Sequence, residues 1–381
     1  MSTIGVLGGG QLGRMLALDA RASGHRVIVR TDEESGGPAA QVADGEVCGH
    51  YEDTEANEQF VCGLDAITVE FENLPPELLR TLSRSVPVRP AASSVEICQH
   101  RKREKRFLEA HGFTHAPFIL ATSAAELHDA VASFEGRAIA KTAAFGYDGK
   151  GQVRFGPSHT TNSTIAWTML SASEVVVESF VDFMMEISVV GARSSDGQWV
   201  PFQPGENVHV NGILDVTVVP ARIPPATAAA ACRIAGEIAS ALGHVGVIGV
   251  EFFVLDDWSL VVNEMAPRPH NSGHHTIDAC ITSQFGQQWR CALNLPLGDP
   301  SPRFGAAATA NLLGELWADG TPQWSVVTDV DRVVLHLYGK AEPRPGRKMG
   351  HLTVLGDTPE EVAGRVTSLR NRLRSETHRS F

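Results

Sequence analysis

Two glutamates near the middle of the chain are spaced to hold a cation together. Glu251 lies in the apolar run 249–255 and Glu264 closes the run 259–264, with an acidic turn between them. Such a turn between β-branched and apolar residues predicts a β-hairpin, which places the two carboxylates on adjacent strands. Carboxylate oxygens are the ligands that Mg²⁺ prefers, and a cation offsets the cost of burying two negative charges. We therefore expect Glu251 and Glu264 to bind Mg²⁺, with Mn²⁺ as an alternative.

The segment 263–276 carries an arginine and several histidines directly after this hairpin. Its two prolines exclude a helix around Arg268 and His270, so both side chains are expected on a stiff extended loop near the metal. Histidines four residues apart on a helix would instead suggest zinc. Gly273 and the prolines argue against that helix, and a loop of surface histidines without a role is a further alternative.

The N-terminus has the pattern of a doubly wound fold. A short buried strand precedes the glycine-rich run 8–13, which opens a helix, and a second strand ends at Asp32. A dinucleotide fold places its ribose-binding acid near that position, so this part alone would indicate a nicotinamide or flavin enzyme. A third strand, 65–72, ends just before Asn73, at the sheet edge where parallel folds bind ligands.

A second glycine-rich segment, residues 145–152, follows a strand that ends in Lys141. Its glycines predict a mobile loop whose backbone amides can approach phosphate oxygens. It is not a Walker A loop, because GxxxxGK[ST] occurs nowhere in the chain. An ordinary hairpin turn is the alternative.

The middle of the chain is expected to form an antiparallel sheet flanked by helices. The strands 174–178 and 185–192 are expected in one sheet, and the valines of the first offer an apolar edge to an adenine ring, or are simply core. A helix at 94–112 carries the basic run 101–106, which is typical of a solvated face. A second helix, 277–289, is expected to face the core through residues at four-residue spacing.

From Arg303 onward, strands alternate with proline and glycine turns, which predicts a small β domain closed by a helix at 359–373. Lys340 and the basic run 344–351 stand in its turns. They are expected either to face an anionic ligand or to remain in solvent.

Composition sets broad limits on function. At 381 residues with 43% apolar content, the chain is expected to form two or three domains. The N-terminus lacks a signal-peptide pattern and no apolar run reaches the ~18 residues of a membrane span, so a cytoplasmic protein is expected. A net charge of -12 argues against nucleic acid, and six cysteines without a CxxC pair are expected to be reduced.

With these segments assembled, the chain resembles the ATP-grasp ligases, and among them the 5-(carboxyamino)imidazole ribonucleotide synthases of bacterial purine biosynthesis. The resemblance covers nearly the whole chain and rests on the segments 8–15, 70–73, 141 with 145–152, 206–209, 263–274 and 344–351. Lys150 stands where the family often has arginine, which keeps the charge. The implied fold is of the α/β and α+β classes: a Rossmann-like pre-ATP-grasp domain at 1–95, an ATP-grasp domain at 96–300 and a C-terminal β-rich domain at 301–381.

The resemblance also implies roles for individual residues. ATP is expected to contact Arg101, Lys141, Gly146, Tyr147, Asp148, Gly149, Lys150, Gly151, Gln152, Glu178, Ser179, Phe180, Val181, Glu186, His209, Asn263 and Glu264. The ribonucleotide is expected to contact Gln11, Glu72, Asn73, Asn271, Ser272, Lys340 and Arg347. The expected catalytic residues are Arg268, His270, Lys340 and Asp148, with the first two holding bicarbonate.

The implied reaction joins ATP, bicarbonate and 5-aminoimidazole ribonucleotide to give the N-carboxylated ribonucleotide, ADP and phosphate. Phosphoryl transfer makes carboxyphosphate, which delivers CO₂ to a weakly nucleophilic amine, and it depends mainly on charge neutralisation. The loop 145–152 is expected to close and exclude water. Family members are commonly homodimers.

Two other functions stay open at this point. One is another ATP-grasp ligase, such as a formate-dependent glycinamide ribonucleotide transformylase or a biotin carboxylase, although the segments 267–273 and 344–351 favour the imidazole enzyme. The other is a dinucleotide-dependent oxidoreductase, which rests on residues 4–32 alone.

Overall fold

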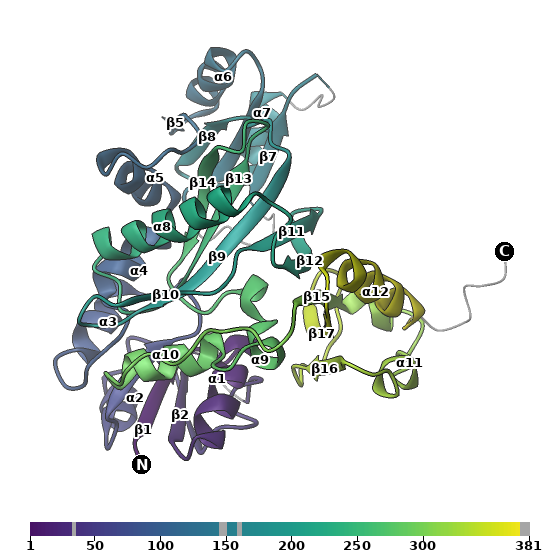
Figure 1. Ribbon diagram of the computed structural model, residues 1–381. Helices are drawn as coiled ribbons and strands as arrows, with labels where there is room; N and C mark the ends of the chain where they lie inside the picture. The colour runs from purple at the N-terminus through teal and green to yellow at the C-terminus, as the bar shows by residue number, and fades with distance from the viewer. Residues whose placement is uncertain (33–35, 145–150, 158–161, 374–381) are drawn as a thin grey trace.

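The computed structural model describes residues 1–32, 36–144, 151–157 and 162–373, and these form three sheets with helices packed around them (Figure 1). In that view the N-terminal sheet lies at the bottom, a small sheet at the top, and the C-terminal strands at the right. Among the described residues, no helix has both the length and the apolar character needed to cross a bilayer.

The N-terminal sheet is parallel, in the order β3-β2-β1-β4, as the doubly wound pattern predicted. Its strands are β1 (Thr3–Leu7), β2 (Arg26–Thr31), β3 (Gly45–Cys48) and β4 (Ala66–Val69), and its helices are α1 (Gln11–Ala22), α2 (Thr54–Val61) and α3 (Pro76–Leu82). The apolar side chains of β1 and β2 are fully buried except for the half-buried Ile28, because helices cover the sheet.

One of these covering helices comes from much later in the chain. The single helix predicted for 277–289 is wrong: α9 (Thr276–Ala279) and α10 (Gln284–Ala292) are separate. The backbone is extended at Cys280, and the Ser283 hydroxyl accepts a hydrogen bond from Gly286 N–H and so begins α10. Trp289 of α10 is buried in the N-terminal core and donates to Asp19 Oδ1 of α1 at 2.7 Å, which fastens the N-terminal sheet to the rest of the molecule.

The helix predicted for 94–112 is also two helices, α4 (Ala92–Cys98) and α5 (Arg101–Ala110), because the backbone of His100 is extended. The solvated-face interpretation of the basic run holds for Arg103 and Arg106, which are exposed. It is wrong for Lys105, whose side chain has no exposed surface.

The small sheet has the order β5-β8-β6-β7 and packs against two helices. Its members are β5 (Phe118–Ala121), β6 (Ala138–Thr142), β7 (Gln152–Phe155), β8 (Val175–Ser179), α6 (Ala124–Ser133) and α7 (Ser163–Leu170). Strands β6 and β7 form the hairpin around the second glycine-rich segment, with Lys141 opposite Gln152. The valines of β8 are fully buried, so that run is core, and the residues just after it are the ones that reach a cavity.

The largest sheet has nine strands, in the order β14-β13-β9-β11-β12-β15-β17-β16 with β10 beside β9. Its strands are β9 (Met185–Arg193), β10 (Trp199–Pro201), β11 (Gly205–Val210), β12 (Ile213–Val219), β13 (Gly246–Val254), β14 (Leu260–Ala266), β15 (Ala306–Leu313), β16 (Val333–Leu337) and β17 (Lys348–Gly356). The prediction that β8 and β9 share one sheet is wrong. Both edges of β8 are taken by β5 and β6, whereas β9 pairs with β13 and β11.

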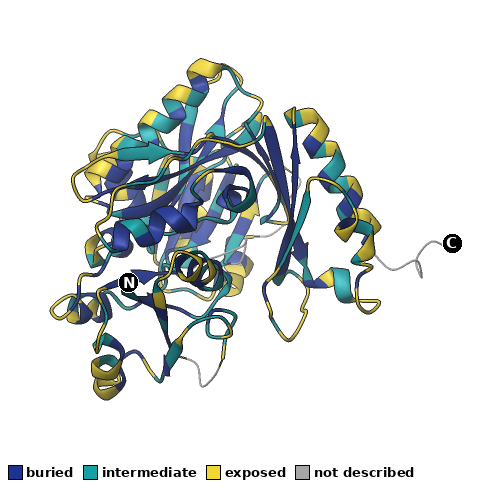
Figure 2. Cartoon of the chain, turned by 60° about the horizontal axis from the view of Figure 1, so that its bottom comes forward, coloured by how far each residue is buried: buried dark blue, intermediate teal, exposed yellow. Residues whose placement is uncertain are grey.

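The strands predicted for the C-terminal domain are present, and they extend the central sheet through the pairing of β12 with β15. Helix α12 (Pro359–Arg372) packs on this end of the sheet, and α8 (Pro225–Ala241) packs on the central part. Three shorter elements remain: η1 (Asn271–Gly273) in the loop after β14, and η2 (Gly314–Trp317) and α11 (Ser325–Thr328) between β15 and β16. Figure 2 shows the buried strands between helices whose outer sides are exposed. The predicted domain boundaries at 95 and 300 stay predictions.

Candidate active site

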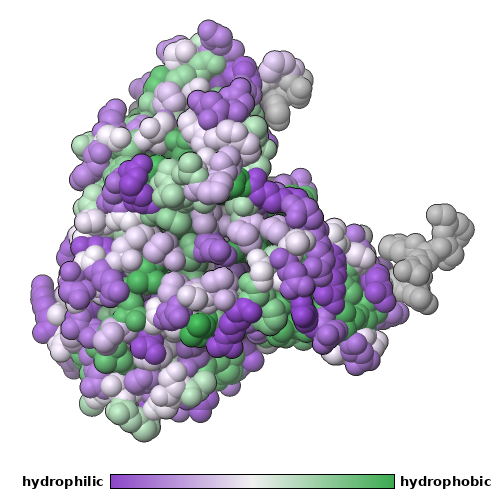
Figure 3. All heavy atoms as spheres, viewed as in Figure 1, coloured by the Kyte–Doolittle hydropathy of each residue, from purple (hydrophilic) through white to green (hydrophobic). Residues whose placement is uncertain are grey.

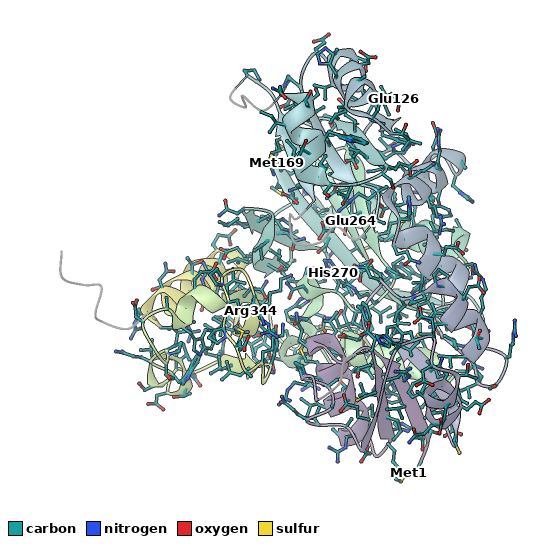
Figure 4. The ribbon with its side chains drawn as sticks, turned by 180° about the vertical axis from the view of Figure 1, so that it is seen from behind. Met1, Glu126, Met169, Glu264, His270 and Arg344 are labelled. Atoms are coloured by element: carbon teal, nitrogen blue, oxygen red, sulfur yellow. The ribbon has the colours of Figure 1, made fainter. Side chains whose placement is uncertain are left out.

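A cavity of about 780 Å³ lies where the N-terminal sheet, the small sheet and both ends of the large sheet meet. The space-filling view shows the molecule hollowed between the small-sheet lobe and the C-terminal part, with hydrophilic residues on the rim (Figure 3). Glu264 and His270 lie centrally where the parts meet, and Arg344 comes from the C-terminal part (Figure 4). The cavity therefore collects side chains that are far apart in the sequence.

The predicted acid hairpin is present. Glu251 of β13 pairs directly with Glu264 of β14, and a β-bulge follows Glu251. Burial, the proximity of Glu264 and that of Glu186 raise the pKa of Glu251 to about 7, although His209 acts in the opposite direction. The Arg101 guanidinium lies 3.3 Å from Glu264 Oε2. The two carboxylates thus concentrate negative charge at one wall of the cavity.

Two residues that were predicted to contact ATP extend this acidic wall. Glu186 of β9 and His209 of β11 lie with Glu251 so that one ligating atom of each is within 4.8 Å of the others. His209 Nδ1 is 3.0 Å from Glu186 Oε2. Burial lowers the pKa of His209, but the hydrogen bond to Glu186 and the charges of both glutamates outweigh it, so the pKa is raised. Carboxylates and an imidazole in this arrangement can hold a divalent cation.

Lys105, Lys141 and Glu178 form a buried ion cluster, and two of them are residues predicted to contact ATP. Lys141 Nζ donates to Glu178 Oε2 at 2.9 Å, and Lys105 Nζ lies 3.6 Å from the other oxygen of the same carboxylate. Burial alone raises the pKa of Glu178, but Lys105, Lys141 and Arg101 lower it to about 2. Lys105 also donates to the Asn263 carbonyl at 3.1 Å, so α5 is tied to the acid hairpin.

Lys105 and its neighbour Glu104 were missed by the sequence analysis. Glu104 accepts a hydrogen bond from Met265 N–H at 2.6 Å, and burial and the proximity of Glu264 raise its pKa to about 8. The available signal was helical spacing, since Arg101, Glu104 and Lys105 share one face with the buried Leu108. A charge on the apolar face of a helix indicates a buried partner elsewhere in the chain.

The first glycine loop does not present a free phosphate site. Gly10 N–H and Gly13 N–H donate to the two carboxylate oxygens of Glu70, at 2.8 and 3.0 Å. The amides that a dinucleotide fold would offer to a pyrophosphate are thus occupied by the protein's own anion. A Cβ at Gly10 would lie 2.6 Å from Glu70 Oε1, so this close approach requires glycine. The dinucleotide interpretation of residues 4–32 is therefore wrong.

The extended loop after Glu264 is held in place from both sides. Arg268 forms a bidentate ion pair with Glu72, including a 2.9 Å bond from Nη2 to Oε1, and its Nη1 donates to the Pro269 carbonyl. The pKa of Arg268 is raised, because Glu72 outweighs the effect of burial. His270 Nδ1 is 2.8 Å from Ser272 Oγ. Burial, Arg268 and Lys348 lower the pKa of His270 to about 3, so its imidazole is neutral at neutral pH.

The surface-loop interpretation is wrong for His274 and His275. The α-helix that would pair His270 with His274 for zinc is not formed, since His270 is extended and residues 271–273 form a 3₁₀ helix. His274 and His275 are only 1% and 4% exposed, and they do not line the cavity that His270 faces. Ser272 is also buried outside the cavity lining, with its hydroxyl 2.7 Å from Ser188 Oγ. It contacts His270 rather than the cavity, so its geometry suits positioning of that histidine.

The C-terminal segment supplies positive charge to the far wall. Lys340 Nζ donates to the Lys348 carbonyl at 2.7 Å and also to Gln11 Oε1 of α1. Arg347 donates to the Glu342 carbonyl at 2.8 Å. Lys348, which belongs to the predicted basic run 344–351, also lines the cavity. Arg154 lines it too and was missed, although it belongs to β7, where strand alternation predicts which side chains share a face.

Most of the predicted site residues come together in this one cavity. Those that line it are Gln11, Glu72, Asn73, Arg101, Lys141, Gln152, Glu178, Ser179, Phe180, Val181, Glu186, His209, Glu251, Asn263, Glu264, Arg268, His270, Asn271, Lys340 and Arg347. Gly151 has a φ of +69° beside Thr142 and is not part of the lining. The predictions for Gly146, Tyr147, Asp148, Gly149 and Lys150 lie outside the described residues.

Comparison with known proteins agrees with this geometry along the whole chain. Family models match as a ribonucleotide synthetase preATP-grasp domain over residues 1–99, an ATP-grasp domain over 106–285, and a phosphoribosylaminoimidazole carboxylase C-terminal domain over 307–365. The N5-carboxyaminoimidazole ribonucleotide synthases of Brucella melitensis and Bacillus subtilis are 42% and 37% identical to it. The match with the Brucella melitensis protein covers 92% of this chain and 96% of the relative, and the match with the Bacillus subtilis protein covers 96% and 95%.

Solved structures give the same result. The ADP complex of an N5-carboxyaminoimidazole ribonucleotide synthetase superposes with a TM-score of 0.90 at 37% identity, over 98% of each chain. The Aspergillus clavatus synthase in complex with ADP and 5-aminoimidazole ribonucleotide gives 0.86 at 29% identity, again over 98% of each. The resemblance and the fold class predicted from the sequence are confirmed. The chain belongs to the N5-carboxyaminoimidazole ribonucleotide synthase family, whose members are ATP-grasp ligases of purine biosynthesis.

Proposed function

We propose that this ligase consumes ATP, bicarbonate and 5-aminoimidazole ribonucleotide, and that all three meet in the cavity described above. The observation that carries the proposal is the charge layout of that cavity. An acidic wall at Glu251 and Glu264 faces a cationic wall at Lys340 and Arg347, with the Arg268 loop between them. Three anionic substrates and a cation fit such a layout, because each charged group has an opposite charge nearby.

The nucleotide belongs at the small-sheet side. Lys141 and Arg101 line the cavity and supply positive charge for phosphate oxygens, and Ser179 to Val181 follow the buried β8 at its rim. Structures of relatives in complex with ADP or ATP support this assignment. Because Lys141 is held by Glu178 and both are buried, the ammonium group is fixed in position before any nucleotide arrives.

Mg²⁺ fits the acidic wall. The pKa of Glu251 is raised because its carboxylate is buried beside other acids, and Asn263 Oδ1 is buried there without a hydrogen-bond partner among the described residues. Oxygen ligands of this kind suit Mg²⁺ or Mn²⁺, and Glu251 with Glu264 would hold it. When bound, the ion neutralises charge on the phosphates during phosphoryl transfer.

Bicarbonate belongs beside Arg268. Glu72 and the Pro269 carbonyl take three of the five guanidinium N–H groups, so two remain to orient an anion. The neutral His270 imidazole lies 3.5 Å from Glu251 Oε1, between this position and the acidic wall. Phosphorylation of bicarbonate here gives carboxyphosphate, which releases CO₂ next to the acceptor amine. Arg268 and His270 hold the anion in line for that transfer.

The ribonucleotide belongs between the N-terminal and C-terminal walls. Lys340, Arg347 and Lys348 supply charge for its phosphate, and Asn73 lines the same cavity. The Lys340 bond to Gln11 joins the two walls directly. Support comes from the relative whose structure holds ADP and 5-aminoimidazole ribonucleotide together.

The test is a two-part turnover assay. Phosphate release from Mg-ATP and bicarbonate is measured with and without 5-aminoimidazole ribonucleotide, and transfer of ¹³C from bicarbonate to the ribonucleotide is followed by NMR. We expect the ribonucleotide to accelerate phosphate release and to acquire the label. Use of formate, biotin or glycinamide ribonucleotide as the better acceptor would contradict the proposal. The homodimer and the cytoplasmic location stay predictions, and sedimentation analysis tests the first.

A further inference from the structure

A second cluster of ligating side chains lies outside the catalytic cavity. Asp278 of α9, His336 of β16 and His351 of β17 come together, so that one ligating atom of each lies within 4.8 Å of the others. None of the three lines the cavity assigned to ATP and the ribonucleotide. They therefore lie outside the site proposed for the ligase reaction.

The cluster is built on the edge of the large sheet. His336 and His351 are directly opposite each other in the β16–β17 pairing, and their rings stack with centroids 4.4 Å apart. Asp278 approaches from α9, and its Oδ2 is 2.9 Å from His336 Nε2. Two ligands on one tetrahedral metal ion at roughly 2.0–2.1 Å lie about 3.3 Å apart. A bound ion would therefore replace the Asp278–His336 hydrogen bond and turn one imidazole out of the stack, since a metal lies in the plane of each ring.

The strongest evidence for a bound ion is the environment of His351 Nε2. This side chain is completely buried, and its Nδ1 is 2.8 Å from the buried Tyr338 hydroxyl. Its Nε2 has no hydrogen-bond partner among the described residues. A buried polar nitrogen without a partner is costly, and a bound cation would satisfy it. If Nδ1–H donates to the tyrosine oxygen, the Nε2 lone pair is left free for a metal, which is the outer-shell arrangement common in metal sites.

His274 places a third imidazole beside this cluster. It is 1% exposed, its ring lies 4.8 Å from that of His351, and its Nε2 also has no partner in the described part of the chain. Three imidazoles and one carboxylate are ligands of the zinc class rather than of Mg²⁺, which prefers oxygen. We propose that Asp278, His336 and His351, with His274 beside them, form a binding site for Zn²⁺ or a closely similar divalent transition-metal ion.

The position of the site gives it a structural consequence. His336 precedes the segment 338–348 and His351 follows it, and this segment carries Lys340, Arg347 and Lys348 to the cavity. Asp278 belongs to the stretch that leads from the catalytic loop into α10. An ion held here therefore fixes the C-terminal cationic wall relative to the loop of Arg268 and His270.

The experiment uses the full-length, untagged protein after removal of metals with a chelator. Zn²⁺ is titrated in competition with a chromophoric chelator, and Co²⁺ serves as a spectroscopic probe of the ligand set. We expect the wild-type protein to bind one equivalent more than the His336→Ala variant, because the acidic wall of the catalytic cavity can hold a divalent cation in both proteins. His336→Ala and Asp278→Asn should each weaken binding by more than about 100-fold, and Tyr338→Phe by roughly 10- to 100-fold. His336 is 24% exposed on an edge strand, so its replacement should leave the fold intact by circular dichroism.

Two control variants separate this site from others. His128→Ala removes an exposed histidine on α6 and should leave Zn²⁺ affinity unchanged. Glu264→Gln alters the acidic wall of the catalytic cavity and should also leave it unchanged. The proposal is overturned if the wild-type protein binds no Zn²⁺ above the level of the His336→Ala variant. It is equally overturned if Glu264→Gln abolishes binding while Asp278→Asn does not. Neither result depends on the ligase reaction.

Discussion

Two buried glutamates, Glu70 directly after β4 of the N-terminal sheet and Glu178 in β8 of the small sheet, have opposite surroundings. Glu70 is held by the N–H groups of Gly10 and Gly13, and its pKa is raised because these bonds and the more distant Arg268 and Lys340 do not offset burial. Glu178 is held by Lys105 and Lys141, and its pKa falls to about 2. Backbone dipoles thus hold a carboxylate in place, but only full positive charges keep it firmly ionised in a dry interior.

The comparison also explains how two motifs mislead. The glycine-rich loop at 8–13 has the pattern of a phosphate site, yet its amides bind Glu70. The basic run of α5 has the pattern of a solvated face, yet it places Lys105 in the interior. In both cases the partner is a glutamate more than fifty residues away in sequence. Local pattern shows which group is available, and only the fold shows what it meets.

The largest effect is expected when the charge of Glu178 is removed. Glu178→Gln leaves two lysines buried without their shared carboxylate, and loss of one partner of a buried ion pair costs about 3–5 kcal/mol. The free energy of unfolding from urea titration at neutral pH measures it. Glu174→Gln is the matched control, because its partner Lys102 is 41% exposed and such pairs contribute about 0–1 kcal/mol. Equal effects of the two changes would contradict the role given to burial.

The same cluster predicts a response to acid. The folded pKa of Glu178 lies below the ordinary glutamate value of 4.5, so its contribution to stability is complete above that pH and is lost as pH falls toward about 2. The wild-type protein should lose about 3 kcal/mol through this group over that window, relative to Glu178→Gln. Unfolding free energies of both proteins at several pH values measure the difference. A constant difference across the window would show that the lysines do not hold the carboxylate ionised.

Glu264 lies between these two environments, since it is 41% exposed and faces both Arg101 and the acid Glu251. Glu264→Gln removes a proposed metal-ligating charge without changing side-chain size, and should lower ATP turnover about 10²-fold or more while leaving the fold intact. Phosphate release at limiting Mg²⁺ measures this effect. Asp32→Asn, at the acid that the dinucleotide interpretation would require, should leave turnover unchanged. Near-normal phosphate release by Glu264→Gln would contradict the proposal that Glu264 is a metal ligand.

Much of the catalytic geometry could be predicted from the sequence because it is local. The hairpin that pairs Glu251 with Glu264 follows from one turn between two apolar runs. The extended course of the Arg268 loop follows from its two prolines. Both depend on neighbours within about fifteen residues, where backbone preference is decisive.

The rest depended on partners that no local pattern reveals. The ion pair of Arg268 with Glu72 crosses from one sheet to another. The division of β8 and β9 between two sheets depends on partners up to 69 residues away, as in the pair Met185 and Val254. The buried cluster around His351 joins residues from α9, β16 and β17. Such contacts form only when the sheets have assembled, so their sequence signal is limited to polar residues at core-facing positions.

The cationic wall extends the comparison to charges that are only partly buried, such as Arg347. Arg347→Ala should raise the KM for 5-aminoimidazole ribonucleotide about ten- to a hundredfold, because a charge-assisted phosphate contact contributes roughly 1.5–3 kcal/mol. Its KM for ATP should hardly change. Arg332→Ala is the control, since Arg332 is 46% exposed, pairs with Asp357 and does not line the cavity. A change confined to the KM for ATP or bicarbonate would contradict the assignment of Arg347.

Arg268→Ala should affect a different constant. Its guanidinium is fixed by Glu72 and oriented toward the anion that is phosphorylated first, so its loss should lower kcat and the use of bicarbonate. Initial rates at varied bicarbonate measure this. The KM for the ribonucleotide should change less than in Arg347→Ala. If Arg268→Ala raised the KM for the ribonucleotide more than Arg347→Ala, the positions assigned to bicarbonate and to the ribonucleotide phosphate would have to be exchanged.

The smallest expected effect belongs to Glu70. Glu70→Gln keeps one oxygen to accept a bond from Gly10 or Gly13 and removes a buried charge, so the loss of an amide contact, worth about 1 kcal/mol, is partly offset at neutral pH. The sign of the pH dependence is the sharper test. Because the folded pKa of Glu70 is raised above 4.5, the wild-type protein binds this proton more tightly when folded and loses stability as pH rises through that folded pKa. The cost of Glu70→Gln, measured by urea unfolding, should therefore be larger near pH 4.5 than at neutral pH. That is opposite to Glu178→Gln, whose cost falls on acidification. If the two variants shared one pH trend, amide dipoles and lysine charges would be equivalent partners for a buried carboxylate in this fold.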